Sequence, residues 1–253
     1  MNKIEVAVLN QAHACPAGMM AFLGRLTQKG HNITNMQDLK DLYNDSMRNH
    51  AAAEWMIALP HGTIKRFTPI TVAIVGASRR FLAQARTNQV GITYVSASLQ
   101  YSDYSNKASF VVPYEVIASD VAFREKYANK CANDESFYRY MIDNGCTNDT
   151  AGYCMNQALR NVLVINANHE AWLHFIRLRS CNRNTEETQY VATLIWEALL
   201  NTNDGPDMFA FAGPDCLYGM CREGKMSCGE PIMDKLPMDI IAERWPLLER
   251  KHG

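Results

Sequence analysis

The sequence predicts an α/β fold in which β-strands alternate with longer helices. The composition is that of a folded protein, since 47% of the 253 residues are hydrophobic and 20% are charged, which excludes a mainly disordered chain. Short β-rich apolar runs are interleaved with segments whose apolar residues recur at helical spacing. No internal repeat or linker separates these segments, so we expect residues 1–253 to form a single domain.

The N-terminal part is expected to form one strand and three helices. Residues 4–9 alternate between polar and apolar side chains, as in a half-buried strand. Helices are expected at 16–29 and 36–47, and Asn35 is suitably placed to cap the second. A short helix at 51–59 should end where the following proline cannot donate a backbone hydrogen bond.

A second strand, a helix and a third strand are expected to follow. Residues 70–75 are a β-rich apolar run that Gly76 is expected to end. Ser78 can cap a helix that continues through Arg86. Residues 92–101 include Thr and Tyr in the alternation typical of a strand.

The rest of the chain is expected to be mainly helical up to residue 200. A short apolar run at 162–165 is the remaining strand candidate. The chain is richer in Gly, Pro and Asp from Asn201 onward, which predicts a loop-rich C-terminal tail at 201–253. The expected helices are one or two within 115–143, a shorter one at 151–160, and two more at 171–178 and 188–200.

The sequence gives no sign of a membrane partner. The longest apolar stretch, residues 67–77, is far shorter than the roughly 20 residues that a membrane-spanning helix needs. The N-terminal residues alternate like a strand and lack the continuous apolar core of a signal peptide. We therefore expect a cytoplasmic protein whose 8 cysteines are reduced.

Cys216, Cys221 and Cys228 lie close together in the tail. Four residues separate the first two and six separate the last two, which differs from the paired Cys-x-x-Cys spacing of a zinc ribbon. A glycine-rich loop with buried or free thiols explains this pattern, and a metal site is the alternative. We expect free thiols and no metal.

The positive charge is concentrated in two parts of the chain. The formal net charge is only −1, but the stretch from residue 55 to 102 contains no Asp or Glu and has the basic residues Lys65, Arg66, Arg79, Arg80 and Arg86. The stretch from 160 to 183 has four arginines against Glu170 alone. A near-neutral total argues against a nucleic-acid partner, so these segments predict a site for a small phosphorylated ligand.

Hydrogen-bonding side chains accompany these basic segments. Thr93, Ser96, Ser98 and Gln100 are expected to share one face of the 92–101 strand. Such a face, beside a basic helix, can hold a ribose, a phosphate or a base edge. An ordinary polar sheet face gives the same pattern.

Three stretches together resemble the flavin-dependent thymidylate synthases. The stretch NHEAWLHFIRLRSCNRNTEETQ is similar to the family's signature helix region. The upstream stretch HGTIKRFTPITVAIVGASRRFLAQARTNQVGITYVSASLQY resembles its Gly-His segment and the strands that follow. The tail GPDCLYGMCREGKMSCG resembles the cysteine-rich tail of some members. The order and spacing of these motifs make the resemblance more specific than any one of them.

The resemblance implies a fold, a reaction and an assembly. The fold would be a central, mainly antiparallel sheet flanked by helices. The reaction would be C5-methylation of a pyrimidine nucleoside monophosphate, most simply of dUMP to dTMP, with FAD as cofactor and with methylenetetrahydrofolate and NADPH as co-substrates. The assembly would be a homotetramer with active sites shared between subunits.

The resemblance also implies roles for individual residues. Arg179 and Arg160 would polarise the pyrimidine carbonyls, and His61 would border the flavin and the folate. The other substrate-binding residues would be Gln84, Ser96, Ser98 and Gln100. The cofactor-binding residues would be His61, Thr63, Arg86, Asn88, Gln89, Asn168 and His174.

The chain departs from the family pattern at several charged positions. The family's Arg-His-Arg triplet is replaced by Thr87-Asn88-Gln89, and Gln100 and Glu170 stand where arginines are expected. Other basic residues of the acid-free segment would have to compensate. Two alternatives therefore stay open: the same chemistry on UMP or a cytosine nucleotide, and a non-catalytic nucleotide-binding relative.

Overall fold

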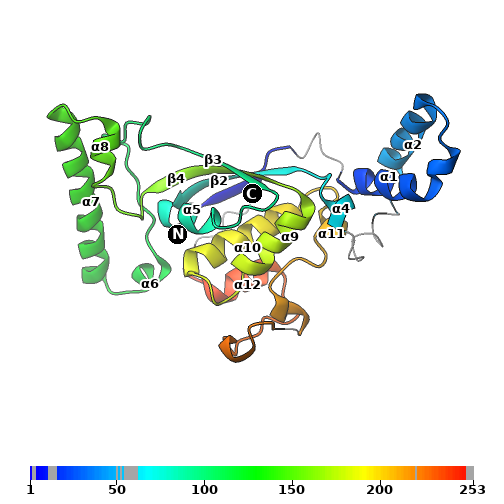
Figure 1. The fold of residues 1–253 in the computed structure, drawn as a ribbon. Helices are drawn as coiled ribbons and strands as arrows, with labels where there is room; N and C mark the ends of the chain where they lie inside the picture. Colours follow the sequence, from blue (N-terminus) through cyan, green and yellow to red (C-terminus); the bar gives the residue numbers. More distant parts are fainter. Residues whose placement is uncertain are drawn as a thin grey trace.

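A four-stranded antiparallel sheet forms the centre of the computed structural model, which describes residues 1, 4–10, 16–49, 51, 53, 62–219 and 221–248 (Figure 1). The strand order is β1-β2-β4-β3, and every pair of neighbours is antiparallel. The last strand in sequence therefore lies between β2 and β3. The strands are β1 (Glu5–Val8), β2 (Ile70–Ser78), β3 (Ile92–Ser96) and β4 (Arg160–Ala167).

The two faces of the sheet differ in what covers them. Val72 on β2 pairs with Ile165 on β4, and both side chains are buried on the face that the helices cover. Val75 pairs with Val162 on the opposite face, where their exposed fractions are 45% and 43%. Val95 on β3 belongs to the same face and is 67% exposed. The period-two alternation of the strands thus leaves one apolar sheet face open to solvent.

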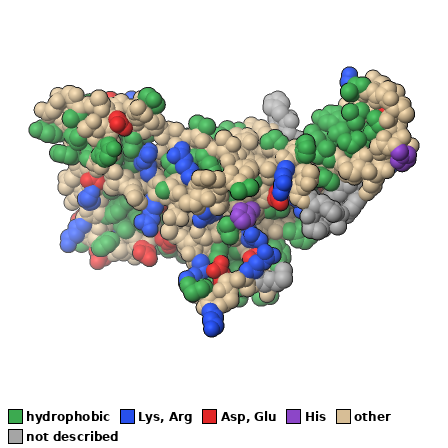
Figure 2. Space-filling model, in the orientation of Figure 1, with side chains coloured by type: hydrophobic (Ala, Val, Ile, Leu, Met, Phe, Trp, Pro, Cys, Tyr) green, Lys and Arg blue, Asp and Glu red, His purple; other side chains and the backbone are tan. Residues whose placement is uncertain are grey.

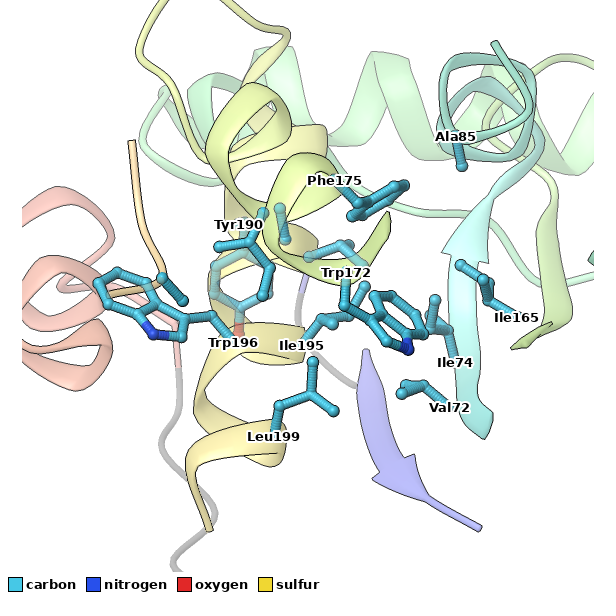
Figure 3. Close-up of a cluster of buried hydrophobic side chains, with 14 of the residues drawn as sticks. Val72, Ile74, Ala85, Ile165, Trp172, Phe175, Tyr190, Ile195, Trp196 and Leu199 are labelled. Atoms are coloured by element: carbon cyan, nitrogen blue, oxygen red, sulfur yellow. The ribbon is translucent and has the colours of Figure 1, made fainter. Parts of the chain in front are cut away.

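Three helices of the C-terminal half cover the buried face: α9 (His169–Arg179), α10 (Glu186–Leu200) and α12 (Pro237–Arg244). Figure 1 shows α9, α10 and α12 on one side of the sheet. Trp172 of α9 contacts Phe175 edge-to-face, with ring centroids 5.8 Å apart, and its indole nitrogen donates to the Ile70 carbonyl. Figure 3 shows the packed core, which includes Val72, Ile74, Ile165, Trp172, Phe175, Ile195, Trp196 and Leu199.

Two helical arms extend from opposite ends of the sheet (Figure 1). At one end α1 (Pro16–Lys29) packs against α2 (Met36–Arg48), and the Asn35 side chain caps α2 as expected. At the other end α7 (Val121–Asp143) is the longest helix of the described residues. The remaining helices are η1 (Gly30–Asn32), α4 (Gly62–Lys65), α5 (Arg79–Ala85), α6 (Tyr114–Ile117), α8 (Asn148–Gly152), α11 (Gly205–Met208), η2 (Asp215–Tyr218) and η3 (Gly224–Met226).

Most of the expected elements are confirmed, and Ser78 caps α5 through a hydrogen bond from the Phe81 amide. Gly76 does not end β2, because its positive φ of 86° creates a bulge between Val75 and Ala77 after which the pairing with β4 resumes. The short helix expected at 51–59 lies largely outside the described residues. Within the described residues, no helix combines the length and apolar character needed to cross a membrane.

Three other expectations are wrong. The third strand ends at Ser96, and residues 97–101 form a turn, since the Ser98 carbonyl accepts from the Ser102 amide. The helix expected at 151–160 is instead the end of α8 followed by turns, and Arg160 already belongs to β4. The segment after residue 201 is not loop alone, because α12 packs on α10 and buries Ile240 and other apolar side chains.

Candidate functional site

The exposed side of α9 is the centre of the candidate site. β4 leads directly into this helix, and the Asn168 side chain accepts a hydrogen bond from the Ala171 amide at 2.9 Å, which caps the first turn. Trp172 and Phe175 face the core. Glu170, His174, Arg177 and other residues at helical spacing therefore point away from it.

Two cavities lie along this side of α9 and share Glu170 and His174. One has a volume of about 530 Å³, and its lining includes Arg66, Gly91 and Asn168. The other has a volume of about 680 Å³, and its lining includes Lys65, Leu173, Arg177, Phe211 and Arg222. We call the two together the α9 cleft. In Figure 2 a His side chain lies near the middle of the visible face of the molecule, with Lys, Arg and acidic side chains around it.

The α9 cleft has a net positive charge. Its two carboxylates both lie close to cations: Glu170 accepts from Arg66 at 2.7 Å, and Asp215 lies 3.5 Å from Arg222. Lys65 and Arg177 add two further positive charges. Burial lowers the pKa of Lys65, and the nearby Glu170 opposes that change. A small anion is therefore favoured in the cleft.

His174 is a neutral imidazole at the middle of the cleft. Burial lowers its pKa first, and the neighbouring Arg177 and Arg179 lower it further. Nδ1 of His174 lies 3.1 Å from an Arg177 nitrogen that donates to it. The remaining ring proton is then on Nε2, so His174 offers one hydrogen-bond donor to a ligand.

Arg179 at the end of α9 joins the helix to the loop after α5. Nη2 of Arg179 donates to the Thr87 hydroxyl and, at 3.1 Å, to Oδ1 of Asn88, while Nη1 donates to Oδ1 of Asn184 at 3.2 Å. Burial lowers the pKa of Arg179, and the nearby Tyr94 opposes this. Nε of Arg179 and Nδ2 of Asn88 are buried and donate no hydrogen bond. These two unused donors are available to a ligand.

Tyr94 fixes the loop that carries Asn88. Its hydroxyl donates to the carbonyls of Ala85 at 2.8 Å and of Asn88 at 2.7 Å. Burial raises the pKa of Tyr94 to about 12, so the phenol stays protonated. Gly91 follows in the same loop with a φ of 73°, and a Cβ there would lie 2.9 Å from Nδ2 of Asn168. The loop thus approaches the N-terminus of α9 where only glycine fits.

The structure brings some of the predicted site residues together. Asn168 and His174 line the α9 cleft, and Asn88 contacts Arg179. Arg86 donates to the Ser96 hydroxyl at 2.8 Å, across the gap between α5 and β3. Thr63 lies on α4, Gln84 on α5 and Gln89 in the loop after α5, and none of the three lines the α9 cleft.

Other predicted residues lie elsewhere. Ser98 and Gln100 are in the turn after β3, so they do not continue a strand face. Thr93 and Ser96 point to opposite faces because they are an odd number of positions apart on the strand. Arg160 lies at the opposite end of β4 from Asn168, where it donates to the Gly76 carbonyl at 2.6 Å. His61 lies outside the described residues.

Part of the cleft was not predicted from the sequence. Arg177 lies one helical turn after His174, so the i,i+3 spacing was a usable signal for it. Phe211, Asp215 and Arg222 come from the segment after α11, and no local pattern linked that segment to α9. His169 is fully buried and bonded to the Met208 carbonyl, so it belongs to the core.

The tail cysteines are free thiols within the described part of the chain, as are Cys131, Cys146, Cys154 and Cys181. Within the described residues, no group of three or more His, Cys, Asp or Glu side chains is placed to hold a metal ion.

Comparisons with known proteins agree with this architecture. Residues 9–202 match the family model described as thymidylate synthase complementing protein. The flavin-dependent thymidylate synthase of Geobacter sulfurreducens is 26% identical over 176 residues, which are 69% of this chain and 74% of that protein. The enzyme of the same name from Pyrococcus furiosus is 27% identical over 169 residues, which are 64% of this chain and 68% of that protein.

Solved structures share the fold. The UMP/dUMP methylase PolB from Streptomyces cacaoi, bound with 5-Br dUMP, gives a TM-score of 0.65 at 14% identity and covers 84% of this chain and 97% of its own. Thymidylate synthase X from Helicobacter pylori, with FAD and dUMP, gives a TM-score of 0.60 at 15% identity and covers 81% of this chain and 96% of its own.

Proposed function

Because the chain belongs to the family of thymidylate synthase complementing proteins, we propose that it is an FAD-dependent methyltransferase acting on C5 of a pyrimidine nucleoside monophosphate. The simplest reaction is dUMP to dTMP, with methylenetetrahydrofolate as carbon donor and NADPH as reductant. The observation that carries the proposal is the positively charged α9 cleft, which lies mainly within the matched segment. We further propose that the protein works in the cytoplasm.

The residues of the cleft fit FAD. Lys65, Arg66 and Arg177 supply positive charge suited to a pyrophosphate, and the buried Asn88 amide has a donor without an acceptor. Glu170 is unfavourable to an anion, but Arg66 at 2.7 Å offsets its charge. FAD, when bound and reduced, supplies the hydride of the reaction. The residues proposed to hold it are His61, Thr63, Arg86, Asn88, Gln89, Asn168 and His174.

Arg179 is proposed to polarise the pyrimidine carbonyls. Its guanidinium is oriented by Thr87, Asn88 and Asn184 before any ligand binds, so little reorganisation is needed when negative charge develops on the ring. The buried Nε is the donor left over for the substrate. Gln84, Ser96, Ser98 and Gln100 are proposed to hold the sugar and phosphate, with Arg86 supporting Ser96 at 2.8 Å.

We propose a homotetramer in which subunits share active sites. The open sheet face formed by Val75, Val95 and Val162 supports an assembly, because a contiguous apolar surface of this kind is normally covered by another chain. Arg160 lies at the far end of β4 from Asn168. That position suits the proposed role of Arg160 in the site of a neighbouring subunit.

UMP is the second candidate substrate. The likeness to a UMP/dUMP methylase favours it, as does Gln100, a neutral side chain at a position where the family pattern has an arginine. Two further alternatives are a cytosine nucleotide as the substrate and a protein that binds a nucleotide without turning it over.

Purified protein loaded with FAD tests these proposals. We expect a yellow protein that oxidises NADPH and methylates dUMP in the presence of methylenetetrahydrofolate, and equal concentrations of dUMP, UMP and dCMP would rank the substrates by kcat/KM. A protein that does not take up FAD would contradict the enzyme proposal, and FAD binding without turnover of any nucleotide would favour the non-catalytic alternative.

A further inference from the structure

A third cavity lies between the end of α9 and the segment that follows α11. It has a volume of about 390 Å³ and is lined by residues 177–184 on one side and by residues of 214–233 on the other. We call it the tail pocket. The segment 214–233 lies beyond residue 202, where the match to the family model ends, and Figure 1 shows it below the helices, in orange. Most of the residues that line this pocket therefore lie outside the family match.

Positive charge dominates the tail pocket. Arg177, Arg179, Arg183 and Arg222 line it, against the carboxylates of Asp215 and Glu223. Asp215 is already shared between two of these arginines, at 3.5 Å from Arg222 and 4.0 Å from Arg177.

Several donors in the pocket have no acceptor. Nε of Arg177 and Nε of Arg179 are buried without a hydrogen bond. Arg183 is exposed and takes part in none of the ion pairs found among the described residues. Nine buried side-chain atoms of the described residues lack a hydrogen-bond partner, and two of them, Nε of Arg177 and Nε of Arg179, belong to residues that line this cavity. Together with Arg183 they leave positive charge in the pocket that its two carboxylates do not neutralise.

The rest of the lining is neutral. Burial raises the pKa of the Cys181 thiol, so this thiol adds no competing negative charge. A concave, largely apolar wall with a few convergent charged groups is the usual form of a small-molecule site, and low local polarity strengthens each charge interaction. The apolar part of the lining comes from Leu178, Pro214, Pro231 and Met233.

We propose that the tail pocket is a second ligand site, which binds a phosphoryl or carboxylate anion through Arg183 and Arg222. The ligand would carry its anionic group on a partly apolar body, to match the neutral lining. The pocket adjoins the α9 cleft, because Arg177, Asp215 and Arg222 line both. The pocket also shares Arg179 with the nucleotide site proposed above, but Arg183 lines the tail pocket and neither cavity of the α9 cleft, so its contact with the anion does not depend on the reaction proposed there.

Binding of two simple anions tests the inference. Isothermal titration of the full chain with inorganic pyrophosphate and, separately, with a triglutamate peptide distinguishes a phosphoryl ligand from a carboxylate ligand. We expect at least one probe to bind, and Arg183→Gln and Arg222→Gln each to weaken that binding by about tenfold or more, the value of one charge-assisted hydrogen bond. Lys225→Gln, on the same segment but outside the lining, should leave it unchanged.

Protection of the thiols gives a second measurement. A bound anion should slow alkylation of Cys221 and Cys228, which line the pocket, and mass spectrometry would locate the effect. Arg183→Gln should remove this protection while dUMP binding remains at the wild-type level. The inference is wrong if neither probe binds, if Arg183→Gln leaves anion binding unchanged, or if it abolishes dUMP binding, since the pocket would then be part of the nucleotide site.

Discussion

Replacing Arg179 by lysine isolates the geometry of the guanidinium from its charge. Arg179 donates to Thr87, Asn88 and Asn184 and retains a buried Nε without an acceptor. Lysine keeps the positive charge but has no planar fork, so it cannot hold these contacts and also present a donor to the substrate. Its ammonium would be drawn toward one of the three acceptors.

The expected loss of kcat/KM in Arg179→Lys equals the contribution of the one hydrogen bond that the substrate would no longer make. A hydrogen bond to a charged group contributes about 1.5–3 kcal/mol, so kcat/KM for the nucleotide should fall by about 10- to 150-fold. Because Arg179 is proposed to act on charge that develops during the reaction, most of the loss should be in kcat. Asn88→Ala leaves the guanidinium in place but less well oriented, so its effect should be smaller.

Steady-state NADPH oxidation with saturating folate and varied dUMP measures both constants. FAD content and Tm, measured on the same samples, would separate a site effect from a folding effect. Arg124→Lys on α7 is the matched control, because it makes the same replacement on an exposed helix face outside the lining of the α9 cleft. An Arg179→Lys enzyme with wild-type kcat and KM would refute the role given to the guanidinium.

Three further outcomes are expected. Burial lowers the pKa of His169 to about 4, so between about pH 4 and 6.5 the unfolded state binds more protons than the folded state. The free energy of unfolding should therefore fall as the pH drops through that window, by about 2 kcal/mol from pH 6.5 to 5. Urea unfolding should show this pH dependence in the wild type, and an equal dependence in a His169→Gln variant would contradict it. Gly91→Ala should lower Tm and FAD affinity more than Gly145→Ala. Both glycines have a positive φ, but only at Gly91 would the added Cβ meet other atoms closely. Equal losses in the two variants would mean that the backbone conformation alone causes the effect. Val95→Glu on the open sheet face should lower the molar mass of the assembly measured by light scattering, whereas Tyr153→Glu, at another exposed position, should leave it unchanged. A monomeric wild type would contradict the proposed assembly.

The sequence was informative wherever local physics decides the structure. Asn35 and Ser78 cap their helices as expected, because a side chain that accepts from a nearby amide is recognisable within four residues. Gly76 was read as the end of a strand, yet β2 continues past it because Arg160 and its neighbours on β4 supply partners for the next residues. A bulge depends on the partner strand, so residues within β2 alone do not reveal it.

The same distinction applies to the candidate site. His174 and Arg179 were found because they belong to one motif on one helix. The contact between Arg179 and Asn88 joins residues 91 positions apart, and Arg222 reaches the cleft from the segment after α11. Such contacts follow from tertiary packing, which no local period encodes. The acid-free stretch nevertheless indicated the right part of the surface, since Lys65 and Arg66 line the α9 cleft.

The position of β4 between β2 and β3 has a consequence for how the chain folds. β2 and β3 are close in sequence, but β3 pairs with β4 alone among the described strands, and β2, which pairs with β1 on one side, finds its other neighbour only in residues 160–167. During synthesis the central part of the sheet therefore waits until those residues have left the ribosome, while α7 can form from contacts within its own segment. Until then β2 and β3 each expose an apolar strand edge, so we expect the protein to fold slowly and to need protection from aggregation early in its synthesis.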